Sequence, residues 1–157
     1  MKRKRTDSDG FTLTELMIVI SIIGLLSILT IPGYQNFMAN WRLKGESEAL
    51  ASTLRTARSA AVMKNIDVVF EFDIDAQEYF WFEDEDRNGS WSAGEYMSGT
   101  RELPEQVRII AHTLSNPTLT FGSKGNTRES GSITLRNVRN QVRDVRIFGG
   151  TGNVTID

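Results

Sequence analysis

Hydrophobic and polar positions divide the chain into three regions. Residues 11–31 are almost continuously apolar, with Glu15 as their only charge, and Pro32 closes the run. From Phe37 onward apolar residues recur at helical spacing, and after Asn65 they alternate with polar residues in short segments. We therefore predict an apolar helix, an amphipathic continuation of that helix and a domain of short strands.

The apolar run is long enough to cross a membrane. As a helix that rises about 1.5 Å per residue, residues 11–31 reach about 30 Å, the thickness of a hydrocarbon core. Residues 1–10 carry four basic side chains, so the positive-inside rule places them in the cytoplasm and the bulk of the chain across the membrane. Residues 27–32 offer no small-residue cleavage site of the secretory type. Hydropathy alone therefore indicates an uncleaved single-pass anchor.

The second region, residues 33–65, is expected to continue the helix. Pro32 and Gly33 should kink the helix rather than end it, because helical spacing resumes, and the end is expected near Lys64–Asn65. One apolar stripe should pack on a β-sheet, and polar residues should cover the other face. The stripe is predicted at Phe37, Trp41, Leu50, Leu54, Ala57 and Ala61, and the polar face at Lys44, Glu46, Glu48, Arg55 and Arg58.

Period-two alternation predicts a β domain at residues 66–157. The first strand centres on Val68–Phe72, and a turn at Asp73–Ala76 leads into a second strand at Gln77–Glu83. Glycines separate the later strands, which are expected at Val107–Ala111, Thr118–Phe121, Ser132–Leu135, Arg143–Phe148 and Val154–Ile156. The expected fold class is α+β, a long N-terminal transmembrane helix packed on a small antiparallel two-sheet β domain.

Composition argues against an enzyme. The chain has no cysteine, which excludes disulfides, thiolate metal sites and cysteine nucleophiles. His112 is the only histidine, so histidine-based zinc sites and Ser–His triads are hard to build, and we expect it to be a packed or surface residue. Between Glu71 and Glu105 the sequence has eleven acidic residues against Arg87 and Arg101. Such a surface attracts cations and repels nucleic acid.

The segment Asp84–Glu95 matches the calcium-loop pattern D-x-[DN]-x-[DN]-G-x5-E without a gap. A structural Ca²⁺ is the one cofactor that the sequence suggests, and none is required. The expected ligands are side-chain oxygens, one carbonyl and one water-mediated contact, from Asp84, Asp86, Asn88, the Ser90 carbonyl, bidentate Glu95 and, through water, Ser92. The flanks resemble strands, so this would be a calcium loop in a β context. The alternative is a solvated acidic hairpin loop.

The N-terminal segment resembles a known processing signal. After the basic leader, Gly10-Phe11-Thr12-Leu13-Thr14-Glu15-Leu16 is similar to the class III signal of type IV prepilins and type II secretion pseudopilins. The resemblance implies that prepilin peptidase removes residues 1–10 by cleavage after Gly10 and N-methylates Phe11. Residues 11–32 would then remain as the transmembrane and assembly helix.

A role for Glu15 follows from that cleavage. The new α-amine of Phe11 would lie four residues from Glu15, on the same helical face. In a filament of packed apolar helices an unpaired carboxylate is costly. We therefore expect Glu15 to pair with a Phe11 amine, its own or a neighbour's, and so to fix the axial register. The alternative is a glutamate that snorkels to the membrane interface.

The β domain resembles the FimT/GspH group of minor pilins and pseudopilins. The resemblance rests on Leu54–Ala61, Leu119–Gly122 with Gly125, Ser132–Arg136 and Thr151–Val154. It implies a structural subunit of a type II secretion pseudopilus or a type IV pilus, anchored in the bacterial inner membrane with its head in the periplasm before it enters the filament. The implied partners are other pilins or pseudopilins of the filament, prepilin peptidase and the inner-membrane assembly platform.

A second function, DNA binding in natural transformation, is known for some FimT-type pilins. A basic stripe could contact phosphates, formed by Arg136, Arg139, Arg143 and Arg146. The alternative interpretation of these arginines is a solvated strand face. DNA-binding relatives carry an arginine motif after the final glycine, whereas Gly152-Asn153-Val154-Thr155 contains no arginine. Together with the acidic stretch, this difference counts against nucleic acid as a partner.

Overall fold

The computed structural model describes residues 10–157, without the side chains of residues 29–32. The leader predicted at residues 1–10 lies outside this range, except for Gly10. The chain forms two compact units, one up to Phe37 and a second over Met38–Asp157. Each unit is described by itself.

A single helix, α1, spans Leu13–Lys64. It runs through Pro32 and Gly33 without ending, as the apolar spacing predicts. It ends at the predicted position, because Asn65 takes a left-handed conformation with φ of 56°. Among the described residues no unbroken helical segment has both the length and the hydropathy of a membrane span. Two parts of α1, Leu13–Ile28 and Gly33–Lys64, together meet the criterion by length and composition.

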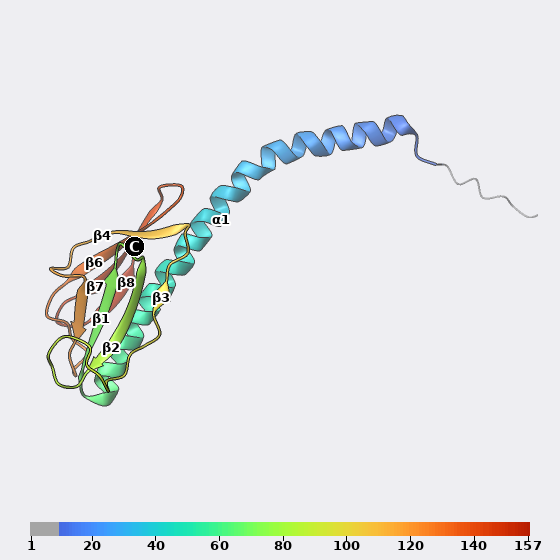
Figure 1. The fold of residues 1–157 in the computed structure, drawn as a ribbon. Coiled ribbons are helices and arrows are strands. Elements are labelled where there is room, and N and C mark those ends of the chain that lie inside the picture. Colours follow the sequence, from blue (N-terminus) through green and yellow to red (C-terminus); the bar gives the residue numbers. More distant parts are fainter. Residues whose placement is uncertain (1–9) are drawn as a thin grey trace, which may run out of the picture. The chain divides into compact units, whose positions relative to one another are not determined.

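The β domain consists of two four-stranded antiparallel sheets (Figure 1). The N-terminal sheet has the order β3-β2-β1-β5, with β1 at Asp67–Asp73, β2 at Glu78–Asp84, β3 at Arg101–Glu102 and β5 at Thr118–Phe121. The C-terminal sheet has the order β4-β6-β7-β8, with β4 at Val107–His112, β6 at Gly131–Asn137, β7 at Val142–Phe148 and β8 at Asn153–Ile156. The two-sheet α+β prediction is confirmed. Only β3 was not predicted, because two residues are too few to show an alternation.

The second half of α1 and the inner faces of both sheets share one hydrophobic core (Figure 1). The strand register explains which side chains enter it. Phe70 pairs with Trp81, and Phe72 pairs with Tyr79, so these rings lie on the same face of the N-terminal sheet. All four are buried, and Leu54 of the helix is buried in the same cluster.

The helical stripe was predicted wrongly at its N-terminal end. Phe37 and Trp41 are 60% and 62% exposed, whereas Ala39 and Leu43 are buried. At about 100° per residue, Trp41 lies about 180° from Leu50, but Leu43 lies within about 20° of it. The spacing of four between the two aromatic residues therefore identified the opposite face of the helix.

The sequence placed Arg55 and Arg58 on the polar face of the helix, but their side chains are not simply solvated. Arg55 Nη2 donates to the carbonyl of Val154 at 2.8 Å. Arg58 Nε donates to the carbonyl of Gly125 at 2.8 Å, and its Nη2 donates to that of Thr151 at 3.0 Å. We call these two residues the arginine clamp, because they bind the helix to β8 and to two loops of the head.

Close packing beneath the clamp requires a glycine at position 152. Its φ is 62°, and a Cβ there would overlap the carbonyl oxygen of Gly125. The resemblance to the FimT/GspH group rested in part on Leu54–Ala61, which contains both arginines, and on the segments with Gly125 and Gly152. The structure shows that the helical segment and these two glycine loops meet at one point of the fold.

Candidate functional site

The first turn of α1 begins with a capping box at Thr12 and Glu15. The backbone N–H of Glu15 donates to Thr12 Oγ1 at 3.2 Å. In return, the backbone N–H and the hydroxyl of Thr12 both donate to Glu15 Oε2, at 3.0 Å and 2.9 Å. Such reciprocal bonds satisfy N–H groups that a helix start leaves open. This arrangement was not predicted, although Thr-x-x-Glu before an apolar run is its usual signature.

The capping box holds the Glu15 carboxylate at the N-terminal end of the helix. There the helix dipole favours a negative charge. The carboxylate contacts the backbone nitrogen of Thr12, the residue directly after Phe11. Gly10 and Phe11 precede the helix, and the Phe11 side chain is 86% exposed. The arrangement can therefore receive a cation at residue 11.

The helix from Leu13 to Ile28 presents apolar side chains on all sides. Its large hydrophobic residues are exposed by about half or more, from Val19 at 49% to Leu13 at 76%. The two serines in this segment donate their hydroxyls to carbonyls one turn earlier, Ser21 to Met17 and Ser27 to Ile23, each at 2.7 Å. Such internal bonds remove the cost of placing a hydroxyl in hydrocarbon. This surface suits lipid or the interior of a helix bundle.

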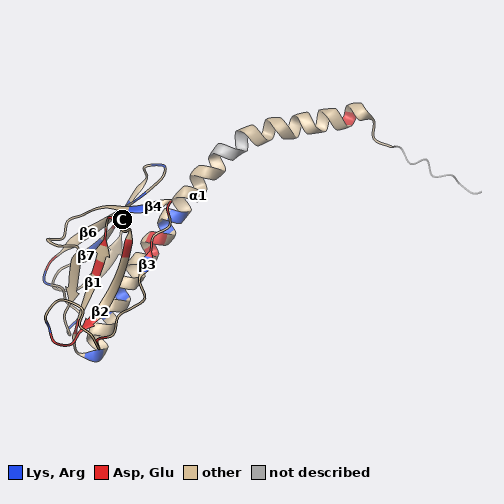
Figure 2. Ribbon diagram, in the orientation of Figure 1, with Lys and Arg blue, Asp and Glu red and all other residues tan. Residues whose placement is uncertain are grey.

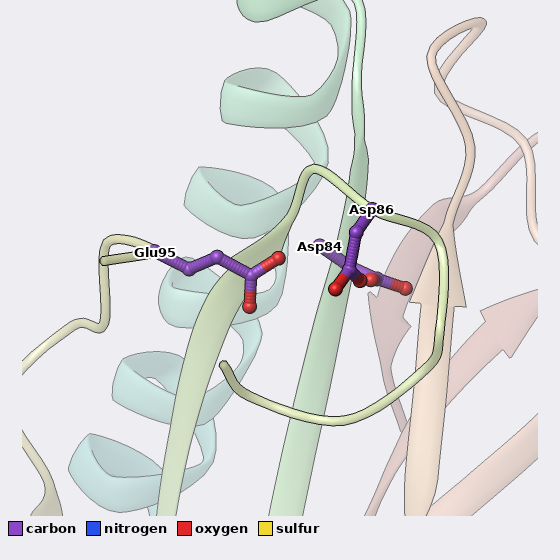
Figure 3. A group of neighbouring side chains, drawn as sticks. All are labelled: Asp84, Asp86 and Glu95. Carbon is purple, nitrogen blue, oxygen red and sulfur yellow. The ribbon is translucent and has the colours of Figure 1, made fainter. Parts of the chain in front are cut away.

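The acidic loop lies between β2 and β3 and brings three carboxylates together (Figure 3). One oxygen each of Asp84, Asp86 and Glu95 lies within 4.8 Å of the others. Glu95 approaches the two aspartates from the far arm of the loop (Figure 3). Asp84 ends β2 and is only 3% exposed. Burial raises the pKa of Asp84 above its ordinary value.

Backbone N–H groups of the loop already bind these oxygens. Asp84 accepts bonds from Asn88 at 3.0 Å and from Gly89 at 2.9 Å. Glu95 accepts bonds from Glu85 at 2.9 Å and from Ser92 at 2.7 Å. The loop therefore holds its carboxylates in place through its own amides. A hard cation could share the remaining lone pairs, and Ca²⁺ binding stays a prediction.

Two further predicted ligands, Asn88 and Ser90, are placed less directly. The amide oxygen of Asn88 accepts a bond from the Ser90 backbone N–H at 2.7 Å. The amide nitrogen of Asn88 donates to Asp86 Oδ2 at 2.8 Å. Asn88 therefore lies beside the carboxylate group, and Ser90 follows it in the same turn.

The four late arginines do not form one stripe. Arg143 pairs with the fully buried Leu135 in the β6–β7 register, so it lies on the inner face of the C-terminal sheet. Arg136 is exposed on the outer face, and Arg146 forms an ion pair with Asp157 at 2.8 Å. Arg139 lies in the turn after β6. The predicted stripe was wrong, because spacing within the sequence ignores the register across the turn.

His112 is a packed residue, as expected. Its ring meets Phe72 nearly edge-on, with centroids 5.1 Å apart and planes 79° apart. It ends β4, whereas Phe72 belongs to β1. The contact therefore joins the two sheets.

Solved structures with the same fold include a minor pseudopilin and a minor pilin. The minor pseudopilin EpsH of the Vibrio cholerae type 2 secretion system is 14% identical, with a TM-score of 0.59 over 74% of this chain and 96% of that chain. The type IV minor pilin FimU of Pseudomonas aeruginosa is 15% identical, with a TM-score of 0.59 over 77% of this chain and 92% of that chain. Both likenesses concern the fold alone.

Curated sequence relatives match only part of the chain. A fimbrial protein of Pseudomonas aeruginosa is 43% identical over 61 residues, which are 38% of each chain. A fimbrial protein of Moraxella nonliquefaciens is 48% identical over 50 residues, which are 32% of each chain. The match thus spans about a third of the length of these relatives.

Two family models together cover most of the chain. The prokaryotic N-terminal methylation motif matches residues 5–31. The model for the type II transport protein GspH matches residues 46–151, well over half of the sequence. The fold is that of a pilin-like subunit, with a long N-terminal helix and two antiparallel sheets. The chain belongs to the GspH family.

Proposed function

We propose that this protein is a minor, membrane-anchored subunit of a pilin-type filament, either a type II secretion pseudopilus or a type IV pilus. The observation that carries the proposal is the union of two modules in one chain, an N-terminal methylation motif at 5–31 and a GspH head at 46–151. The apolar helix supplies the anchor and later the filament core. The head supplies the surface by which the subunit meets its neighbours.

Processing is proposed at the bond between Gly10 and Phe11. Both residues lie before the first helical residue, and Phe11 is exposed, which supports access by prepilin peptidase. Hydrolysis of this amide frees an α-amine on Phe11, and N-methylation leaves that amine basic. The helix stays attached to the head, so cleavage changes the charge of the anchor without releasing the protein.

Glu15 is proposed to pair with that amine. Its carboxylate reaches back to the backbone nitrogen of Thr12, directly beside residue 11. When apolar helices pack together in a filament, an uncompensated carboxylate among them is costly. An amine from the same chain offsets that cost in any register, whereas a neighbour's amine offsets it at one axial position only. Pairing with a neighbour therefore favours one register of the helices.

Mass spectrometry and filament shearing test the proposal with the full-length protein in a host that carries the assembly machinery. We expect a mature N-terminus at methylated Phe11. Glu15→Ala should insert in the membrane at the normal level but enter sheared filaments poorly, whereas Glu48→Ala, an exposed acid of α1, should enter normally. An intact Met1 end would refute processing, and wild-type incorporation of Glu15→Ala would refute the pairing role.

The parent machine and the DNA-binding alternative need their own observations. Neighbouring genes for general secretion would favour the pseudopilus, and a cluster of minor pilin genes would favour the pilus. DNA binding has less support, because Arg143 and Arg136 lie on different faces of their sheet. A low-salt gel shift that Arg143→Ala with Arg146→Ala abolishes would restore that alternative.

A further inference from the structure

The C-terminal sheet carries two arginines directly opposite one another on its outer face. In the register of β4 and β6, Arg108 pairs with Arg136. Both side chains are exposed. Their strand neighbours Val107, Ile109 and Leu135 are buried, so alternation along each strand turns both guanidinium groups away from the core. We call these two residues the arginine pair.

No carboxylate of the described part of the chain forms an ion pair with the arginine pair. Like charges directly opposite one another destabilise a sheet. Neither guanidinium forms a hydrogen bond or an ion pair with another described residue. Glu105 lines a hollow of about 180 Å³ together with both arginines but forms no ion pair with them. On the same sheet, Arg146 is neutralised by Asp157 at 2.8 Å.

Apolar side chains lie beside the pair. Val142 is directly opposite Arg136 on β7 and is 57% exposed. Val138, just after β6, is 64% exposed. A small inorganic anion gains nothing from such neighbours, whereas a protein surface can bury them. The patch therefore fits a protein partner with carboxylates.

The N-terminal sheet carries a complementary row. Asp73 of β1 pairs with Glu78 of β2, and Glu78 pairs with Glu102 of β3, so three carboxylates follow one line across three strands. Asp73 accepts bonds from the amides of its own turn at 2.7 Å and 2.9 Å. Glu78 and Glu102 form no side-chain hydrogen bond or ion pair in residues 10–157. Figure 2 shows acidic residues along β1 and β2 and a basic residue on β4.

We propose that the arginine pair of one subunit binds the acidic row, Asp73, Glu78 and Glu102, of a second copy of this chain. Each patch places like charges side by side without an ion pair to a described residue, and contact between copies relieves the repulsion on both sides. The contact joins two different patches of the same chain, so it is heterologous and needs only two adjacent copies. The filament setting rests on the proposed function, but the contact between heads does not.

The absence of cysteine makes crosslinking a direct test. Two full-length copies with different tags are co-expressed, one with Val142→Cys beside the arginine pair and one with Ala76→Cys beside the acidic row. Mild oxidation of membranes should yield a mixed disulfide dimer. Arg108→Glu with Arg136→Glu in the first copy should lower its yield about tenfold, which corresponds to about 1.4 kcal/mol.

Reversing the charges of both patches distinguishes a loss of electrostatic attraction from misfolding of the variant. Glu78→Lys with Glu102→Lys in the second copy should restore the dimer of the reversed first copy. Lys124→Glu with Arg128→Glu changes the net charge equally at another loop and should leave the yield unchanged. Membrane levels and protease resistance of each variant check its fold.

Four outcomes would overturn the proposal. Three of them are no mixed dimer with wild-type charges, a yield that the reversal does not change, and no rescue by the exchanged charges. Crosslinking to a different filament subunit instead of the second copy would equally overturn it. The N-terminus of the same samples is measured by mass spectrometry, so that failed processing is distinguished from a failed contact.

Discussion

At the residue scale, Lys64 compensates a buried carboxylate. Its ammonium lies 2.7 Å and 2.8 Å from the two carboxylate oxygens of Glu83. The Glu83 side chain is 4% exposed, and that of Lys64 is 53% exposed. Glu83 pairs with the buried Val68 across β1 and β2, so it lies on the inner face, toward the helix. The last turn of α1 is thereby bound to the N-terminal sheet.

Removal of this ammonium should cost stability. Lys64→Met leaves Glu83 buried without a cation, and we expect the free energy of unfolding to fall by about 2 kcal/mol, less than for a fully buried pair because Lys64 is half exposed. Lys44→Met removes an exposed i,i+4 partner of Glu48 at 3.8 Å and should cost no more than about 0.5 kcal/mol. Denaturant unfolding of residues 38–157, a compact unit with its own core, measures both. Equal losses would contradict the role of Lys64.

At the element scale, backbone amides of the acidic loop hold its carboxylates in place. The order of the loop and its binding of a metal ion can therefore be tested separately. If the loop binds Ca²⁺, millimolar Ca²⁺ should raise the melting temperature of residues 38–157 relative to chelator, because binding only to the folded state stabilises it. Asp86→Asn with Glu95→Gln should abolish the increase. Glu102→Gln, an acid outside the loop, should retain it. An unchanged wild-type melting temperature would show that the loop is a solvated hairpin.

The loop also predicts a dependence on pH in chelator. The pKa of Asp84 is raised from its ordinary value of 3.8, chiefly by burial. As pH rises from about 3.8 through the folded-state pKa, the unfolded chain has already released its proton while the folded chain still binds it. The stability of the wild type relative to Asp84→Asn should therefore fall over this range and then level off. A difference that grows with pH would contradict the burial effect.

Local patterns allowed most elements and one candidate site to be predicted. Alternation identified every strand except β3, and the loop at residues 84–95 was recognised because its carboxylates are neighbours in sequence. The hydrogen bonds of the Arg58 side chain could not be predicted, because the carbonyls that accept them lie 67 and 93 residues away in the sequence. The arginine pair depends in the same way on the register of β4 and β6. Side-chain spacing along one segment contains no information about such pairings.

At the scale of the whole molecule, the glycine loops and the arginine clamp hold the helix and the C-terminal sheet together. Gly152→Ala meets a positive φ, which alone costs about 1–2 kcal/mol, and its Cβ would displace the Gly125 carbonyl that Arg58 binds. Gly150→Ala meets a similar φ of 78° but open space. We expect Gly152→Ala to lower the free energy of unfolding clearly more than Gly150→Ala. Equal losses would show that the overlap relaxes without disturbing the clamp.

The arginine clamp also has a mechanical consequence. A filament that extends or retracts pulls its subunits along their helices, and the force must reach the head through whatever joins the two. In the proposed filament, Arg55 and Arg58 would carry that force directly to the carbonyls of Val154, Gly125 and Thr151, to which they donate hydrogen bonds. Several bonds share the load there, so the last strand and the loops should resist being peeled from the helix one at a time.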